Sequence, residues 1–208
     1  MSPTGSMVYV VDDDVSVCRA LRLLLKSHGF RAETFTSAEG FLGFKHPKIP
    51  SCLILDIRLP NINGFALQEI MCQRGIVTPI IFITGHGNIP MTVRAMKAGA
   101  IDFLSKPFTA KDLLQSIALA LTRSQVQNKK QAEIAKIKKC ISTLSPRELE
   151  VFHLVARGML NKQIASKRGT ALQTIKVHRG RVMQKMQTRT VTELIRLAQK
   201  AGITSTLD

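Results

Sequence analysis

Short apolar runs alternate with amphipathic stretches over the first half of the chain. Most of the runs are rich in Val, Ile, Leu and Phe and are flanked by turn residues, which predicts strands. The predicted strands cover residues 8–11, 31–35, 52–55, 80–83 and 101–104. Helical periodicity follows the first strand, with Val17, Leu21, Leu24 and His28 on one stripe, and recurs near 63–73 and 89–98. This alternation favours an α/β fold with a parallel sheet covered on both faces.

The second half has a helical pattern throughout. The run S-P-R-E at 145–148 combines an N-cap serine, a proline at the first helical position and a glutamate at the third. Thr190 and Glu193 have the same capping-box spacing, and another helix is expected over roughly 171–187. These starts predict an all-α arrangement after about residue 144.

The stretch between the two halves contains no helix breaker. No Gly or Pro lies between Pro107 and Pro146, and a helix is expected to begin near Thr109. That helix is expected to continue through 123–141 as an amphipathic linker helix. A partly disordered polar linker is the alternative.

Net charge is concentrated in the second half. The chain has 30 Lys and Arg against 14 Asp and Glu, a formal charge of +16. Residues 1–122 carry twelve basic and nine acidic residues, a net +3, whereas residues 123–208 carry eighteen basic and five acidic, a net +13. A polyanionic partner is therefore expected for the second half. Charge alone does not choose among DNA, RNA and an anionic membrane.

Cysteine usage and hydropathy indicate the compartment. Cys18, Cys52, Cys72 and Cys140 form neither a C-x-x-C pair nor a zinc-spaced cluster, so free thiols in a reducing environment are expected. No apolar run is long enough to cross a bilayer, and the polar opening residues lack the pattern of a secretory signal. We therefore expect a cytoplasmic protein without a membrane partner.

Acidic residues end two of the predicted strands. Asp12 and Asp13 follow the first strand, and Asp56 ends the third, so their carboxylates are expected at one edge of a parallel sheet. Crowded carboxylates repel, and a hard cation such as Mg²⁺ (or Mn²⁺) relieves that repulsion. Thr84 and Lys106 end the fourth and fifth strands and add a hydroxyl and an ammonium group. Together these groups suit phosphoryl chemistry on a carboxylate.

Four ordered motifs in this half resemble the receiver domain of two-component response regulators. They are V-V-D-D-D, L-D-I-R-L-P-N-I-N-G, I-T-G-H-G and D-F-L-S-K-P-F. The resemblance implies a flavodoxin-like (βα)₅ fold in which Asp56 is phosphorylated. It also implies a metal site made by Asp12, Asp13, Asp56 and the backbone carbonyl of Arg58. The switch and phosphate-binding residues that it implies are Thr84, Phe103 and Lys106.

The basic half resembles the LuxR-type helix-turn-helix, through L-S-P-R-E-L-E-V, G-M-L-N-K-Q-I-A and T-I-K-V-H-R. The whole chain thereby looks like a NarL/FixJ-class regulator. On the helix expected from Ala171, the core stripe is predicted to be Ala171, Ile175, His178, Val182 and Met186. The predicted DNA contacts are Lys162, Gln173, Lys176, Val177, Arg179, Gly180 and Arg181, and Lys185 flanks the same face.

This half departs from the family pattern at one place. The family usually has Leu-Gly-Ile-Ser where this chain has Arg168, Gly169, Thr170 and Ala171. The helix therefore lacks its usual serine cap, and Thr170 with Gln173 is an alternative cap one residue earlier. The register of the base contacts depends on which start is used.

The two resemblances divide the chain and imply a function. The expected parts are a disordered leader at 1–6, a receiver at 7–122, a helical linker at 123–143 and a LuxR-type DNA-binding domain at 144–208. They imply a phosphorylation-controlled transcription regulator, expected to be an activator. Its implied partners are a sensor histidine kinase, double-stranded promoter DNA, RNA polymerase and a second copy of the phosphorylated chain.

Two other functions remain open from the sequence. One is a Mg²⁺-dependent phosphohydrolase with Asp56 as its nucleophile, for which the sequence offers neither a cap domain nor a separate acid or base. The other is a DNA-binding module that works without phosphorylation. We expect no enzymatic activity beyond the chain's own phosphorylation and dephosphorylation.

Overall fold

A parallel sheet organises the first part of the computed structural model, which describes residues 5–203. In the described residues its five strands are ordered β2-β1-β3-β4-β5, the order of flavodoxin-like folds. All four neighbouring pairs are parallel. The strands are β1 (Met7–Val11), β2 (Arg31–Phe35), β3 (Ser51–Asp56), β4 (Ile80–Thr84) and β5 (Asp102–Ser105).

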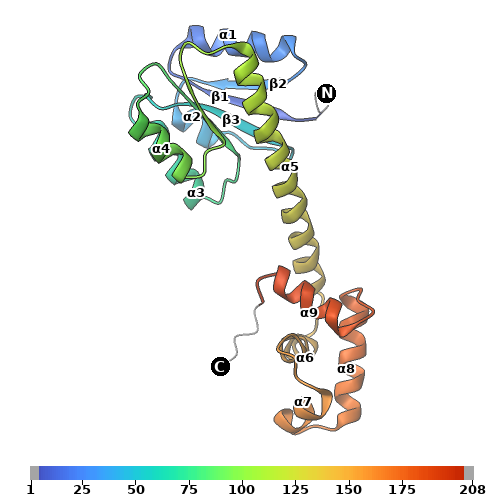
Figure 1. Cartoon of the computed structure of the whole chain (residues 1–208). Helices are drawn as coiled ribbons and strands as arrows, with labels where there is room; N and C mark the ends of the chain where they lie inside the picture. Colours follow the sequence, from blue (N-terminus) through green and yellow to red (C-terminus); the bar gives the residue numbers. More distant parts are fainter. Residues whose placement is uncertain (1–4, 204–208) are drawn as a thin grey trace. The chain divides into compact units, whose positions relative to one another are not determined.

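Helices cover both faces of this sheet because its central strands are apolar on both sides (Figure 1). One face packs against α1 and α5 through Val8, Val10 and their neighbours. The other face packs against α2, α3 and α4 around Tyr9 and Phe82. The helices are α1 (Val15–Ser27), α2 (Ala38–Gly43), α3 (Gly64–Gln73), α4 (Ile89–Lys97) and α5 (Ala110–Ile141).

Helix α5 is continuous for 32 residues and ends at Ile141, two residues before the end of the predicted linker at 143. The chain divides into two compact units, residues 1–129 and 130–208, and α5 contributes to both. Ile137, near its end, is 5% exposed in the core of the second unit. The alternative prediction of a partly disordered linker is therefore wrong. The last turns of α5 remain helical because their apolar side chains pack into the core of the second unit.

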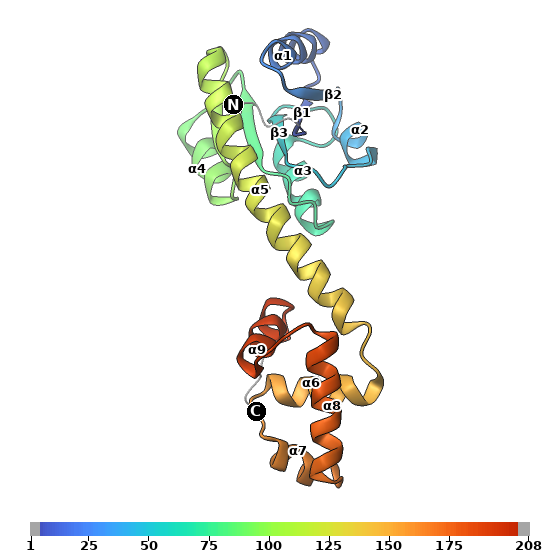
Figure 2. The same cartoon turned by 90° about the vertical axis from the view of Figure 1, so that its right-hand side faces the viewer.

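Four helices follow α5 in the described part of the second unit: α6 (Pro146–Ala156), α7 (Asn161–Arg168), α8 (Leu172–Lys185) and α9 (Val191–Lys200). The predicted capping boxes at Ser145 and Thr190 both form. Figure 2 shows these four helices. Phe152, Ile164 and Leu194 are fully buried in a core of their own. No helix of the described residues is long and apolar enough to cross a membrane.

The structure differs from the sequence predictions at the start of the chain and at α2. Residues 1–4 of the predicted leader are outside the described residues, and Ser6 is 3% exposed. Ser6 therefore packs against the folded domain, and the backbone N–H of the next residue, Met7, donates to the carbonyl of Pro50. Helix α2 was not predicted, because six residues with two glycines show no helical periodicity.

Candidate functional site

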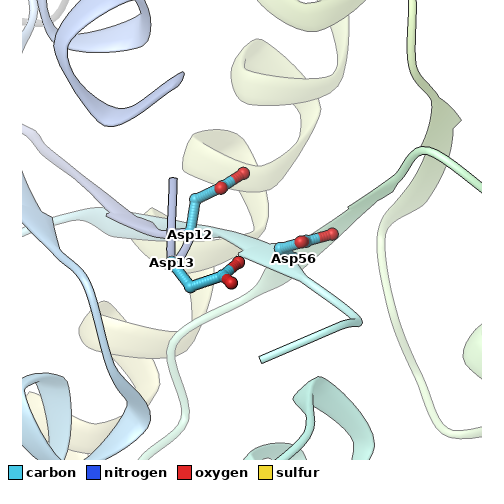
Figure 3. Close-up of side chains that lie close together, drawn as sticks. All are labelled: Asp12, Asp13 and Asp56. Atoms are coloured by element: carbon cyan, nitrogen blue, oxygen red, sulfur yellow. The ribbon is translucent and has the colours of Figure 1, made fainter. Parts of the chain in front are cut away.

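Three carboxylates meet at the carboxyl edge of the sheet (Figure 3). β1 pairs with β3 so that Val11 lies beside Leu55, which brings Asp12 and Asp13 next to Asp56. One oxygen from each of the three carboxylates lies within 4.8 Å of the others. The prediction that these carboxylates lie together at one edge of the sheet is thus confirmed. Asp14 serves a different purpose, since its side chain caps α1 by accepting from the N–H groups of Ser16 and Val17.

Lys106 is the cation of this cluster. Its Nζ lies 2.6 Å from Oδ2 of Asp12 and 3.8 Å from Oδ2 of Asp56. Burial raises the pKa of Asp56 to about 6, with a further rise from the neighbouring Asp12 charge and a partial offset from Lys106. The Oδ1 atom of Asp56 is buried and has no hydrogen-bond partner among the described residues. This oxygen is therefore a buried acceptor that the described residues leave free.

The ends of β4 and β5 place the other predicted pocket residues. Thr84 is fully buried, and it follows Ile83, which pairs with Asp56. The backbone N–H of Lys106 donates to the carbonyl of Thr84 at 2.8 Å, which ties the two strand ends together. The Lys106–Pro107 bond is cis. Phe103 is partly buried against the core under α2–α4.

The donor set suits a hard divalent cation. Mg²⁺ prefers carboxylate and carbonyl oxygens, and a carboxylate oxygen without a partner favours a cation beside it. Asp12, Asp13 and Asp56 supply such oxygens. Arg58, the predicted source of a carbonyl ligand, lies two residues after Asp56 and lines a surface groove together with Asp13.

One contributor to this site was missed from the sequence. Gly64 lies directly against the end of β3, and a Cβ there would be 2.6 Å from the carbonyl oxygen of Asp56 and 3.0 Å from Cα of Ile57. A side chain at this position is therefore excluded by the backbone that carries Asp56. The N-I-N-G run was a signal for this residue, but its packing role needs the fold to be seen.

In the second unit, α7 and α8 form the predicted helix-turn-helix. Gly169 ends α7 in the left-handed conformation, with a φ of 57°. The exposed side of α8 contains four of the predicted DNA contacts, and another lies near the start of α7. These exposed residues are Gln173, Lys176, Gly180 and Arg181 on α8 and Lys162 on α7. Val177 is 45% exposed on the same side, an apolar group suited to a thymine methyl.

Two predicted cations are held by neighbours within the unit. Arg179 donates to Oδ1 of Asn161 at 2.6 Å, which fastens α8 to the start of α7. Lys185 donates to Oε2 of Glu148 at 2.6 Å and to the carbonyl of Thr143 at 3.0 Å. The Lys185 hydrogen bond and that from the N–H of Ser145 lower the pKa of Glu148 to about 2. Lys185 therefore joins α8 to α6 and does not lie free beside the exposed face.

Helix α8 begins at the later of the two predicted starts. Ala171 is its N-cap without a side-chain hydrogen bond, so the alternative cap by Thr170 is wrong. Of the predicted core stripe, Ile175, Val182 and Met186 are buried and His178 is partly buried. Ala171 is exposed, because it precedes the first helical residue.

Two family descriptions match the chain in the same two regions. "Response regulator receiver domain" matches residues 8–118, and "Bacterial regulatory proteins, luxR family" matches residues 142–198. The first covers the sheet and its carboxylate cluster, and the second covers α6 to α8 and most of α9.

Full-length relatives share both regions. Nodulation protein W from Bradyrhizobium diazoefficiens is 46% identical over 202 residues, which cover 97% of this chain and 89% of that protein. The response regulator protein TmoT from Ectopseudomonas mendocina is 42% identical over 200 residues, which cover 96% of this chain and 91% of TmoT.

Solved structures agree with this assignment. The response regulator StyR has 45% sequence identity and a TM-score of 0.77, over 94% of this chain and 99% of StyR. Full-length FixJ from B. japonicum has 37% identity and a TM-score of 0.54, over 95% of this chain and 97% of FixJ. The chain therefore belongs to the NarL/FixJ class of response regulators, and it is a two-component transcription regulator with a receiver domain and a LuxR-type DNA-binding domain.

Proposed function

We propose that Asp56 accepts a phosphoryl group from the phosphohistidine of a sensor histidine kinase. The phosphorus–nitrogen bond of the donor breaks, the bond from phosphorus to a carboxylate oxygen of Asp56 forms, and the imidazole leaves. The observation that carries this proposal is the unpartnered Oδ1 of Asp56, buried beside two carboxylates and a lysine. An acyl nucleophile needs such a free oxygen and a nearby positive charge.

Asp12, Asp13, Asp56 and the carbonyl of Arg58 are the residues proposed to hold Mg²⁺ (or Mn²⁺). The cation would neutralise charge on the transferring phosphoryl oxygens. Lys106 already lies between Asp12 and Asp56, so it can pair with a phosphoryl oxygen by a small movement. The hydroxyl of Thr84 would donate to another phosphoryl oxygen. We propose no turnover of an external substrate beyond this self-phosphorylation and its reversal.

Phosphorylation is proposed to make the α4–β5–α5 face pair with a second copy. Movement of Thr84 toward the phosphoryl group would leave room for Phe103 to turn inward and reshape that face. Ile89, Val93 and Met96 support this proposal, because they expose apolar side chains on α4 at 81%, 45% and 47%. Exposed apolar patches of this kind favour a protein partner.

The dimer would then bind a two-fold promoter site with its two α8 helices. Lys176 and Val177 lie at the centre of the exposed face and are the proposed base-reading residues. Two linked half-sites raise the affinity through effective concentration. We propose that the regulator is an activator, cooperating with RNA polymerase at its promoter.

The test is intact mass spectrometry after incubation with Mg²⁺ and acetyl phosphate, with the elution volume recorded on the same samples. We expect one phosphoryl adduct and a shift toward a dimer for the wild type, and neither for Asp56→Asn. Glu69→Gln, which removes an exposed carboxylate on α3, is the matched control and should behave as the wild type. An adduct that persists in Asp56→Asn would overturn the assignment of the phosphoacceptor.

A further inference from the structure

Glu150 lies between two arginines at the contact of α6 and α7. Its Oε2 accepts from Nη1 of Arg147 at 3.2 Å and from Nη2 of Arg168. The side chains of Arg147, Glu150 and Arg168 are 70%, 42% and 36% exposed. Arg168 is also the residue at which this chain departs from the LuxR-type pattern, which usually has leucine there.

This charged cluster borders the recognition helix. Together with Thr174 and His178 of α8, its three side chains line a pocket of about 310 Å³. Thr174 directly follows Gln173, and His178 directly follows Val177, so the pocket runs along one flank of the proposed DNA-reading face. When a helix lies in the major groove, the sugar–phosphate backbone passes along its flanks.

The cluster has more positive charge than its single acid can balance. Two guanidinium groups share one carboxylate, which leaves a net charge of +1. Arg157 and Lys167 line an adjoining pocket with Arg168 and extend the positive surface. Ion pairs as exposed as these add little to folding stability. Stability therefore explains the placement of two arginines around one glutamate poorly. Guanidinium groups, by contrast, match the geometry of a phosphate oxygen pair.

We propose that Arg168 and Arg147 bind a phosphodiester of the DNA backbone beside α8, and that Glu150 competes with this phosphate for the two guanidinium groups. The inference rests on the proposed DNA-binding function and adds a positioning contact to it. Arg168 then sets how α8 enters the groove without reading a base. Glu150 weakens every DNA complex by the same factor, because phosphates have no sequence.

The test uses the full-length protein with Mg²⁺ and acetyl phosphate, and duplexes of random sequence titrated by fluorescence anisotropy at several salt concentrations. Arg168→Leu should lower the affinity roughly tenfold and reduce the salt slope by about one. Glu150→Gln should raise the affinity roughly threefold, the range of an exposed ion pair. Arg168→Leu restores the usual family residue and therefore should keep the fold.

The matched controls come from the other exposed pair of the same unit, Lys200 with Glu133. Lys200→Gln and Glu133→Gln change the net charge as the test variants do, but away from α8, and should shift affinity less. A Glu150→Gln protein that binds DNA more weakly than the wild type would show that the cluster is structural and overturn the proposal. The proposal would also be overturned if Arg168→Leu and Glu150→Gln changed the DNA affinity only as much as Lys200→Gln and Glu133→Gln do. A wild type that fails to bind any duplex at low salt would instead contradict the DNA-binding function itself.

Discussion

Replacing Asp56 by asparagine should stabilise the receiver at neutral pH. Burial raises the pKa of Asp56 from its ordinary 3.8 to about 6, so the folded state resists the charged form. The rise from 3.8 to about 6 corresponds to about 3 kcal/mol. Asp56→Asn keeps the shape of the side chain and removes this cost.

The sign of the pH dependence follows from the direction of the shift. Below pH 3.8 the carboxyl is protonated in both the folded and the unfolded state, and wild type and variant should be equally stable. As the pH rises from 3.8 to about 6, the wild type loses stability relative to the variant, because its unfolded state releases the proton first. Above about pH 6 the gap should be constant at up to about 3 kcal/mol.

The receiver provides its own reporter for this measurement. Tyr9 is the only tyrosine of the chain, which has no tryptophan, and it is fully buried in the receiver core. Urea unfolding followed by tyrosine fluorescence, with EDTA present to remove metal, therefore reports on the receiver alone. Glu69→Gln, the loss of a carboxylate that is 70% exposed, is the control. Equal stability of Asp56→Asn and wild type at pH 8, or a gap that widens toward acid, would refute the reasoning.

Three further predictions concern single residues. Glu148→Gln should lower the stability of the DNA-binding domain by about 2 kcal/mol at neutral pH. The difference should disappear as the pH falls from 4.5 to about 2, because the hydrogen bonds that lower the pKa of Glu148 stabilise only its charged form. Hydrogen exchange of α6 and α8 peptides measures this stability. Gly64→Ala should destabilise the receiver by about 1–3 kcal/mol and slow adduct formation, because its Cβ would meet the Asp56 carbonyl at 2.6 Å; unchanged tyrosine-detected unfolding would contradict this. Gly180→Ala should slow exchange in α8, with a gain of up to ~1 kcal/mol, since the added Cβ would meet no described atom within 4 Å apart from its chain neighbours and the nearby backbone of α8 itself.

The receiver pocket could be predicted because its residues lie at the ends of apolar strands. Once strands at 8–11, 52–55 and 80–83 are recognised, parallel pairing alone brings Asp12, Asp56 and Thr84 to one edge. No side-chain detail is needed for that step. The two capping boxes could be predicted from local spacing alone, because their partners are three residues apart.

Contacts between residues distant in sequence were beyond such reasoning. The pair of Glu148 with Lys185 and that of Glu150 with Arg168 join α6 to helices 18 to 37 residues later, and no local pattern indicates them. Lys185 could thus be assigned to the flank of the DNA-reading face on helical phase alone, whereas its charge is used to hold α8 against α6.

The middle of α5 differs from its two ends because it buries no side chain in either apolar core. From residue 125 to residue 136, all within the described part of the chain, no side chain is buried, whereas Leu121 and Ile137 on either side are 3% and 5% exposed. The contacts of these twelve residues are at the surface, such as the ion pair of Glu133 with Lys200, and an isolated helix of about that length is marginal in water. The helical stability of this stretch therefore depends more on local sequence than that of the two ends, through Ala, Gln and Lys content and through charge spacing. A substitution to glycine or alanine there changes the conformational entropy of the connection while leaving both apolar cores intact, so selection can adjust this segment separately from phosphorylation chemistry and from DNA recognition.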